Sequence, residues 1–388
     1  MDALVSTTLV IGGDLCPVGR IGPVLERGDG GAAFGSLLPD LQSADLFMAN
    51  LECPLVDRAT PAIKGGPVLG FSPRCLAGLK QANLSLLGLA NNHIMDHGHQ
   101  GLTGTIEACR MAGIDTVGAG GDLAEAGRLW MRNVGDHRLG VLALSEAEYS
   151  LAGPHRPGAN SMDVIRTAKM LRAARTACDF LVVLVHGGNE HLDIPRPGLR
   201  DFCRWLVEEG ARVVVCQHSH CVGTYESYAS GLIVYGQGNL LFDYPSQQAM
   251  WRYGVLIKLC LDSGGGFTHE FVPYSLRPAG TGIERLPAME AEAFLSGFRA
   301  RSLVLADEEA YERQWRQFCE SRRSRYMSLI HGFCRPLYLL NRTGLLTRLL
   351  FTRTQLRNIG NVIRCESHRD VLTTLADVDL ERERGSRI

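Results

Sequence analysis

The chain has 388 residues, of which 45% are hydrophobic and 21% are charged, and its formal net charge is −1. This length is enough for two domains, or for one large domain with an appendage. The near-zero charge gives no reason to expect nucleic acid or a membrane as a partner, and no run of about 18 apolar residues is present to cross a bilayer.

The twelve cysteines do not form the pattern of a secreted disulfide framework. No C-x-x-C pair occurs, and Cys178, Cys216 and Cys260 lie in or beside apolar runs, as buried thiols do. The first residues lead into an apolar run without the basic and long apolar regions of a signal peptide. We therefore expect a soluble, cytoplasmic protein.

Apolar, β-branched-rich runs alternate with helical patterns from residue 1 to about residue 280. Buried strands are predicted at 7–12, 46–49, 84–90, 180–185 and 213–216, and further strands, expected to pair antiparallel, at 232–235 and 254–261. Helices are predicted at 73–82, 102–113, 161–177 and 198–209. This alternation predicts a layered α/β domain over residues 1–280.

Residues 281–388 predict a different structure, an Arg-rich helical C-terminal extension. They have helical spacing and few strand signals, and only four of the 40 basic residues of the chain are Lys. The basic face that includes Arg322, Arg323 and Arg325 is either a solvated helix surface or a carboxylate-binding lid over the site. Homo-oligomerisation is another expected role of the extension, and residues 381–388 are expected to be disordered.

Five of the predicted strands stop at residues that bind metals or transfer protons. Ligands gather at the carboxyl ends of strands in α/β sheets, so we expect these side chains at one edge of a sheet. Carboxylate and amide oxygens suit Ca²⁺, Mg²⁺ or Mn²⁺, whereas imidazoles suit Zn, Fe or Mn. The mixed set therefore predicts a divalent metal ion without choosing between Ca, Mn, Fe and Zn. The candidate metal ligands are Asp14, Glu52, Asn92, His186, His218 and His220.

The order of these motifs resembles one protein family. In sequence they are Gly13-Asp14-Leu15-Cys16, Asn50-Leu51-Glu52, Asn91-Asn92-His93 with Asp96, His186-Gly187-Gly188-Asn189-Glu190, His218-Ser219-His220 and Gly236-Gln237-Gly238-Asn239. Over about residues 7–245 the chain resembles the CapA family of poly-γ-glutamate capsule biosynthesis proteins, which have a calcineurin-like metallophosphoesterase fold. The resemblance implies a calcineurin-like layered α/β sandwich, metal at the candidate ligands, and His93 as a catalytic acid that could pair with Asp96.

The motifs also depart from those of calcineurin-like phosphoesterases. Those enzymes open with D-x-H, whereas Cys16 stands at the position of the imidazole, and Glu52 stands where they carry Asp. Gln217 precedes His218, and Gly187 follows His186 in place of an aromatic residue. These departures leave open whether one metal ion or two would bind.

Three enzymatic functions compete: hydrolysis of a phosphoester, poly-γ-glutamate biosynthesis, and epimerisation of a ribosomal, lasso-type precursor peptide. The polymer role belongs to proteins usually anchored by an N-terminal membrane segment, which is not seen here. A fourth reading, a peptide-binding module without activity, conflicts with the intact Asn-Asn-His-x-x-Asp block.

Epimerisation needs one base to remove a Cα proton and an acid on the opposite face to return it. His93 with Asp96 would be one pair, and one of His186, His218 or His220 with Asp14 or another carboxylate would be the other. Arg20 or the Arg-rich extension would bind the carboxylate of the peptide substrate. We favour a metal-dependent peptide epimerase, with a metallophosphoesterase as the alternative. The candidate catalytic residues are His93, Asp96, Asp14, His186 and His220, and the candidate substrate-binding residue is Arg20.

Overall fold

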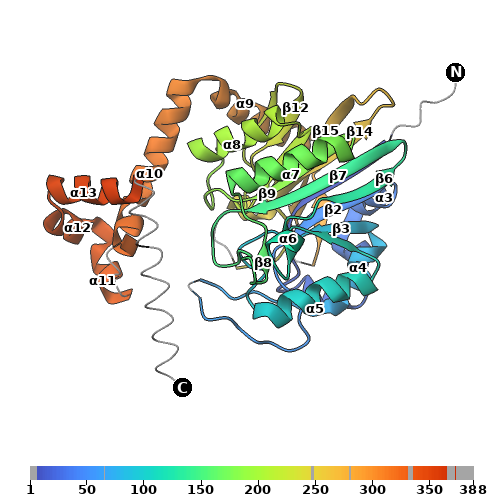
Figure 1. The fold of residues 1–388 in the computed structure, drawn as a ribbon, viewed down its shortest axis with the longest axis horizontal. Helices are drawn as coiled ribbons and strands as arrows, with labels where there is room; N and C mark the ends of the chain where they lie inside the picture. The colour runs from blue at the N-terminus through green and yellow to red at the C-terminus, as the bar shows by residue number, and fades with distance from the viewer. Residues whose placement is uncertain are drawn as a thin grey trace. The chain divides into compact units, whose positions relative to one another are not determined.

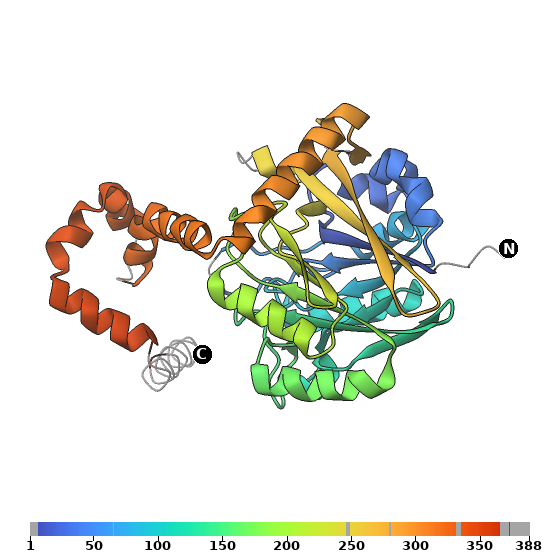
Figure 2. The same cartoon turned by 90° about the horizontal axis from the view of Figure 1, so that it is seen from above.

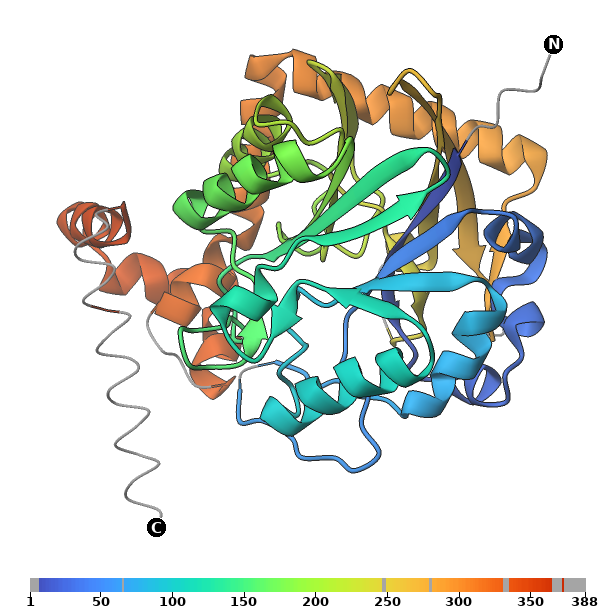
Figure 3. The ribbon, with the colours of Figure 1, turned by 45° about the vertical axis from the view of Figure 1, so that its right-hand side comes forward.

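The computed structural model describes residues 7–64, 66–245, 249–278, 281–330, 335–364 and 372. The chain forms two compact units, Met1–Glu308 and Glu309–Ile388. The first unit is a layered α/β structure in which helices flank two sheets, as predicted (Figures 1 and 3). The segment 381–388, expected to be disordered, lies outside the described residues.

The first sheet has the strand order β16-β15-β14-β1-β2-β3-β4, with β13 also paired with β1. Strands β1 to β4 run parallel, whereas β14 runs antiparallel to both β1 and β15, as expected for the segment 254–261. The strands are β1 (Thr7–Cys16), β2 (Leu46–Leu51), β3 (Leu84–Gly88), β4 (Asp115–Val117), β13 (Asn239–Phe242), β14 (Tyr253–Leu261), β15 (Phe267–Leu276) and β16 (Ile283–Arg285).

The second sheet has the order β11-β12-β10-β9-β7-β6, and its four inner strands are parallel. Every residue of β9 and β10 is buried, which explains their continuous apolar sequences, because both faces of an inner parallel strand are covered. Its strands are β6 (Trp130–Val134), β7 (His137–Ser145), β9 (Phe180–His186), β10 (Val213–Gln217), β11 (Tyr225–Tyr228) and β12 (Gly231–Val234). A small pair joins β5 (Ala119–Gly120) to β8 (Gly158–Ala159).

The helices of the first unit cover the outer faces of the two sheets (Figure 1). Helices α4 and α5 contact β3 and β4, whereas α7 and α8 contact β7 and β10. Side-chain caps start α6 and α7, where Asp122 and Asp163 accept backbone N–H groups. The helices are α1 (Gly22–Glu26), α2 (Gly30–Phe34), α3 (Leu38–Gln42), α4 (Leu76–Gln81), α5 (Gly98–Met111), α6 (Leu123–Ala126), α7 (Val164–Ala177), α8 (Pro197–Glu208) and α9 (Ala288–Ser302), with 3₁₀ turns at Gly35–Leu37, Pro73–Cys75, Ala249–Arg252 and Leu303–Ala306.

The boundary between the two units lies between Glu308 and Glu309, and not near residue 280. Helix α9 belongs to the first unit and lies alongside β15, in orange beside the yellow strands in Figure 2. Its Phe298 is fully buried, with ring centroids 4.7 Å from Tyr225 and 5.0 Å from Phe271. The sequence changes from alternating strands and helices to helices alone before the apolar core of the first unit ends. For this reason the composition of the chain placed the boundary between the units too early.

The second unit is helical in the residues that the structure describes. It contains α10 (Glu308–Ile330), which begins at the boundary, α11 (Arg335–Leu340), a 3₁₀ turn (Asn341–Thr343), α12 (Leu345–Leu350) and α13 (Arg353–Arg364). None of the helices in the described parts of the chain is long and apolar enough to cross a membrane.

Candidate metal centre

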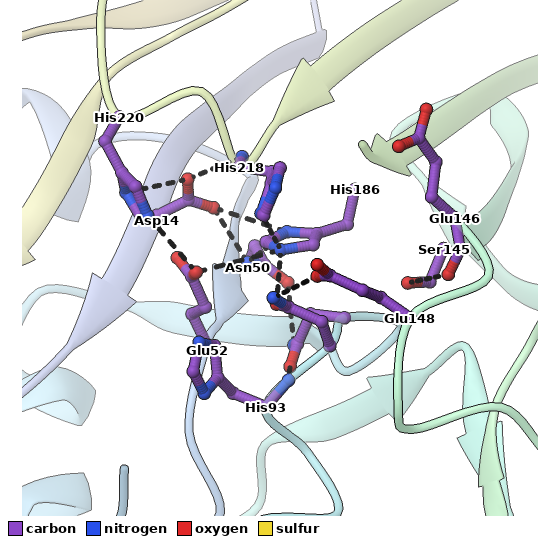
Figure 4. Close-up of polar contacts among 12 residues, drawn as sticks. Asp14, Asn50, Glu52, His93, Ser145, Glu146, Glu148, His186, His218 and His220 are labelled. Carbon is purple, nitrogen blue, oxygen red and sulfur yellow. Dashed lines mark hydrogen bonds and ion pairs between the residues drawn. The ribbon is translucent and has the colours of Figure 1, made fainter. Parts of the chain in front are cut away.

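The polar strand ends that the sequence pointed to come together, but from two sheets and not from one. Asp14, Glu52 and Asn92 lie at the ends of β1 to β3 in the first sheet, whereas His186 and His218 lie at the ends of β9 and β10 in the second (Figure 4). The expectation of a single sheet edge was wrong, because buried parallel strands have the same sequence pattern in either sheet. The site therefore lies where the carboxyl ends of two sheets meet.

Two groups of side chains in the described residues could each hold a metal ion, and Glu52 belongs to both. The first group is Asp14, Glu52 and His220, and the second is Glu52, His186 and His218. Within each group the ligand atoms lie within 4.8 Å of one another. The arrangement can therefore accept one cation or two that share a carboxylate, which is a common geometry for hydrolytic metal centres.

Glu52 is fully buried, and neither carboxylate oxygen has a hydrogen-bond partner among the described residues. Burial raises the pKa of Glu52 well above its usual range, and the nearby carboxylate of Asp14 raises it further. A buried carboxylate without a partner is costly, and a bound cation would remove that cost. The residues present thus fit a divalent metal ion.

Asp14 is held by two donors that fix its orientation. Its Oδ1 accepts a hydrogen bond from Asn50 Nδ2 at 2.8 Å, and its Oδ2 accepts one from the backbone N–H of His218 at 2.8 Å. Burial nevertheless raises the pKa of Asp14 to about 6. Asn50 also lies 3.2 Å from His186 Nδ1, so this residue joins both sheets. Asn50 is part of a sequence motif, but the sequence predicts no role for it, since an amide at a strand end has no distinctive spacing.

Burial favours the neutral form of His186 and His220, which is the form that binds metals. Burial lowers the pKa of His186 far below its usual range and lowers the pKa of His220 to about 3. His186 Nε2 lies 3.1 Å from Asn92 Oδ1 and 3.2 Å from His218 Nδ1. His220 Nδ1 lies 2.9 Å from Asn239 Oδ1, and its other nitrogen, Nε2, faces Glu52 at 3.5 Å.

His218 and His220 both have left-handed backbone conformations, with φ values of +93° and +52°. Such angles cost about 1–3 kcal/mol in a residue other than glycine and are concentrated at functional sites. The turn that they form directs the backbone N–H of His218 at Asp14 and brings both rings to one centre. We attribute this strained turn to the function of the site.

His93 lies beside the two metal-binding groups but belongs to neither. Its Nδ1 is 2.6 Å from Asp96 Oδ2, as the sequence predicted. Asp96 is also paired with Lys64, whose Nζ lies 3.2 Å from the same ring nitrogen. With Nδ1 held by this pair, Nε2 is the nitrogen that can exchange a proton with a substrate. Lys64 was missed, because nothing in the sequence ties residue 64 to a strand end.

Asn92 links the centre to a further carboxylate. Its Oδ1 contacts His186, and its Nδ2 donates a hydrogen bond to Glu148 Oε2 at 2.6 Å. Glu148 is exposed and reaches the site from the segment that follows β7 (Figure 4). It too was missed by sequence analysis, because it follows its strand by several residues in a polar loop.

Arg20 does not offer a free guanidinium to a substrate. Its Nε and Nη2 donate to the two carboxylate oxygens of Asp243 at 2.8 and 2.7 Å, and its backbone N–H donates to the same side chain. Such a bidentate pair satisfies the planar fork of the arginine. The expectation that Arg20 binds a substrate carboxylate is therefore not supported by its geometry.

The part of the chain that is similar to known proteins includes this whole site. The sequence profile of the bacterial capsule synthesis protein PGA_cap family matches residues 8–244, a range that includes every candidate ligand. The chain belongs to this family. It is 28% identical over 279 residues to the capsule biosynthesis protein CapA of Bacillus anthracis, covering 70% of this chain and 67% of that protein. It is 26% identical over 282 residues to the PGA biosynthesis protein CapA of Bacillus subtilis, covering 72% and 73%.

Solved structures similar to this PGA_cap protein include two proteins described as hydrolases. A novel phosphatase from Mycoplasma pneumoniae gives a TM-score of 0.45 at 16% identity, covering 70% of this chain and 94% of that one. A 5'-nucleotidase from Candida albicans gives a TM-score of 0.39 at 8% identity, covering 81% and 58%.

Metal binding by this PGA_cap protein should weaken in acid because of its carboxylates and not because of His186 or His220. Below about pH 6 the metal-free protein holds a proton on Asp14, and binding must displace it, whereas His220 stays neutral down to about pH 3. The apparent affinity for Mn²⁺ should fall at least about tenfold for each pH unit below 6. Calorimetry in two buffers of different ionisation enthalpy should show proton release on binding at pH 6. An unchanged affinity between pH 7 and pH 5 would exclude Asp14 as a ligand.

Gly13 should tolerate no side chain, because β1 and β13 approach closely there. A Cβ at this position would lie 2.0 Å from the carbonyl oxygen of Gly238, which is backbone and cannot move independently. Gly13→Ala should therefore destabilise the fold by at least about 2 kcal/mol and displace Asp14. Urea unfolding measures the first effect and metal content the second. Gly31→Ala is the matched control, since the nearest atom there would be 3.6 Å away.

Proposed function

We propose that this protein is a metal-dependent phosphoester hydrolase. The observation that carries the proposal is the sharing of Glu52 by two metal-binding groups. Asp14, Glu52 and His220 would hold one cation, and Glu52, His186 and His218 a second. When bound, such cations polarise a phosphoryl oxygen and lower the pKa of a coordinated water.

The side chains beside the centre supply the proton chemistry of this reaction. Asp96 accepts a hydrogen bond from His93 Nδ1–H, so Nε2 is the nitrogen that exchanges a proton with the substrate. As an imidazolium, the ring would give its Nε2 proton to the departing alkoxide and become neutral. Lys64 is almost fully buried and balances the charge of Asp96. Asn92, between His186 and Glu148, orients both groups toward the centre.

Peptide epimerisation is the second candidate, and Glu148 is the observation that favours it. Epimerisation needs two acid–base groups, and His186 and His220 each lie 3.8 Å from Asp14, within ion-pair distance but too far for a hydrogen bond. Glu148 is a carboxylate beside Asn92 that could serve as the partner of His93. A role in capsule polymer biosynthesis, which the names of the relatives indicate for those proteins, is compatible with either chemistry.

A single set of incubations in D₂O separates the two candidates. The protein loaded with Mn²⁺, with and without a chelator, is given p-nitrophenyl phosphate and bis(p-nitrophenyl) phosphate, and separately a set of synthetic peptides that differ in their C-terminal residue. Chelator-sensitive release of p-nitrophenol supports the hydrolase. Deuterium incorporation at one peptide Cα without hydrolysis of either ester contradicts it and supports the epimerase.

A further inference from the structure

The charge of the chain is unevenly distributed along its length. Residues 321–364 contain nine Arg and no Lys, Asp or Glu, so this basic segment carries +9 and the rest of the chain carries −10. The net charge of −1, from which we expected no membrane partner, conceals this separation. A segment of this length with arginine as its only charged residue is suited to an anionic surface.

The basic segment also presents its apolar side chains to the outside. Ten of the 22 exposed large apolar side chains in the described residues lie within it. In α11 four consecutive apolar residues are exposed, including Leu339 and Leu340 at 53% and 68%. Leu349 of α12 is 73% exposed. A concentration of exposed apolar side chains in one segment fits binding to another apolar surface.

The buried side chains that the structure describes in the same segment are polar. They are Ser328, Asn341 and Thr347. Asn341 donates to Ser328 Oγ at 2.9 Å and to Thr347 Oγ1 at 2.8 Å, and its Oδ1 accepts the backbone N–H of Thr347 at 3.1 Å. Among the described side chains of the segment, the buried ones are thus polar and many leucines are exposed, which suits an apolar surrounding.

Helix α13 separates the two kinds of residue around its axis. At about 100° per residue, its three arginines recur within about 40° of one another. Leu356, Ile359 and Ile363 recur within about 60° of one another on a different side. An amphipathic helix with arginine on its polar face lies in the plane of a membrane interface, with its apolar face in the acyl boundary.

We propose that the described part of the basic segment, residues 321–330 and 335–364, binds the surface of an anionic phospholipid bilayer. The arginines contact lipid phosphates, and the exposed leucines and isoleucines of α11, α12 and α13 enter the acyl boundary. No described helix could span the bilayer, so the attachment is interfacial. The inference is independent of the chemistry proposed for the metal centre, and helices α10 to α13 are the orange-to-red part of Figure 1.

Cosedimentation of the full-length protein with vesicles tests this proposal. Vesicles of phosphatidylcholine and phosphatidylglycerol (3:1) at 0.1 M NaCl should bind the protein at least tenfold more than vesicles of phosphatidylcholine alone. Leu339→Glu with Leu349→Glu should lower the binding to anionic vesicles at least tenfold, and so should Arg348→Glu with Arg353→Glu. Leu303→Glu is the matched control, because Leu303 in the first unit is also 73% exposed. Its binding should equal that of the wild type.

Three results would overturn the proposal. The first is an absence of binding to either vesicle, and the second is undiminished binding by both double variants. The third is a lipid-free dimer, seen by analytical ultracentrifugation at micromolar concentration, that the leucine substitutions dissociate. That result would assign the exposed leucines to a second copy of the chain.

Discussion

Replacing Glu52 by glutamine should leave a folded protein that no longer retains metal. Glu52→Gln keeps the shape of the side chain but removes the one carboxylate that both metal-binding groups use. We expect metal affinity to fall by at least about 100-fold, beyond the 10- to 100-fold loss typical of residues that only orient a ligand. Metal content after dialysis and a calorimetric titration with Mn²⁺ measure this loss, and activity should disappear with the metal.

The thermal stability of the same variant separates loss of a ligand from loss of the fold. Since burial raises the pKa of Glu52, its ionised form destabilises the metal-free fold, and this cost develops as the pH rises through the raised pKa. The uncharged glutamine avoids the cost. Metal-free Glu52→Gln should therefore melt at or above the temperature of the metal-free wild type, and added Mn²⁺ should no longer raise it.

A matched control is Glu107→Gln, which makes the same change at an exposed position of α5. It should retain metal and should still be stabilised by added Mn²⁺. Full metal retention by Glu52→Gln would remove Glu52 from the ligand set and, with it, the sharing on which the proposed hydrolase rests.

Replacing His93 by alanine should abolish turnover and leave metal binding intact. The imidazole lies outside both metal-binding groups, so His93→Ala should change the metal content little. Loss of the proton donor should lower kcat by about 10²- to 10⁴-fold. The fold should persist, because Asp96 keeps its contacts with Lys64 and with the backbone N–H of Leu69. Steady-state kinetics with p-nitrophenyl phosphate and metal analysis on the same preparation test both parts.

His99→Ala serves as the control for this variant, since His99 is exposed on α5 six residues away in sequence. It should keep full activity. A His93→Ala protein that turns over at the wild-type rate would disprove the acid–base role, whatever the reaction proves to be.

The sequence by itself predicted the carboxylates and imidazoles that the structure brings together. Each of Asp14, Glu52, His186 and His218 follows a run of apolar residues too continuous for a surface strand, and such runs end at the edge of a buried parallel sheet. The pairing of His93 with Asp96 was also predicted from the sequence, because the two residues are three positions apart in a short turn. The layered α/β architecture followed from the same alternation of strands and helices.

Only the tertiary structure showed which sheet each of these residues belongs to and which side chains it contacts. Strands β1 to β3 belong to one sheet, and β9 and β10 belong to the other. This division depends on hydrogen bonds between strands that lie far apart in the sequence. The contacts of Lys64 and Glu148 come from loops, whose paths no periodicity records.

The pairing of Arg20 with Asp243 shows the same limit, because the partners are 223 residues apart. A sequence reveals a charged group and its local spacing, whereas long-range packing decides whether that charge is free for a substrate or already neutralised. The composition of residues 321–364 was likewise readable from the sequence, but only the structure showed that its amides and hydroxyls are inside and its leucines outside. The burial of a side chain depends on all its neighbours in space, and the order of residues along the chain does not record these neighbours.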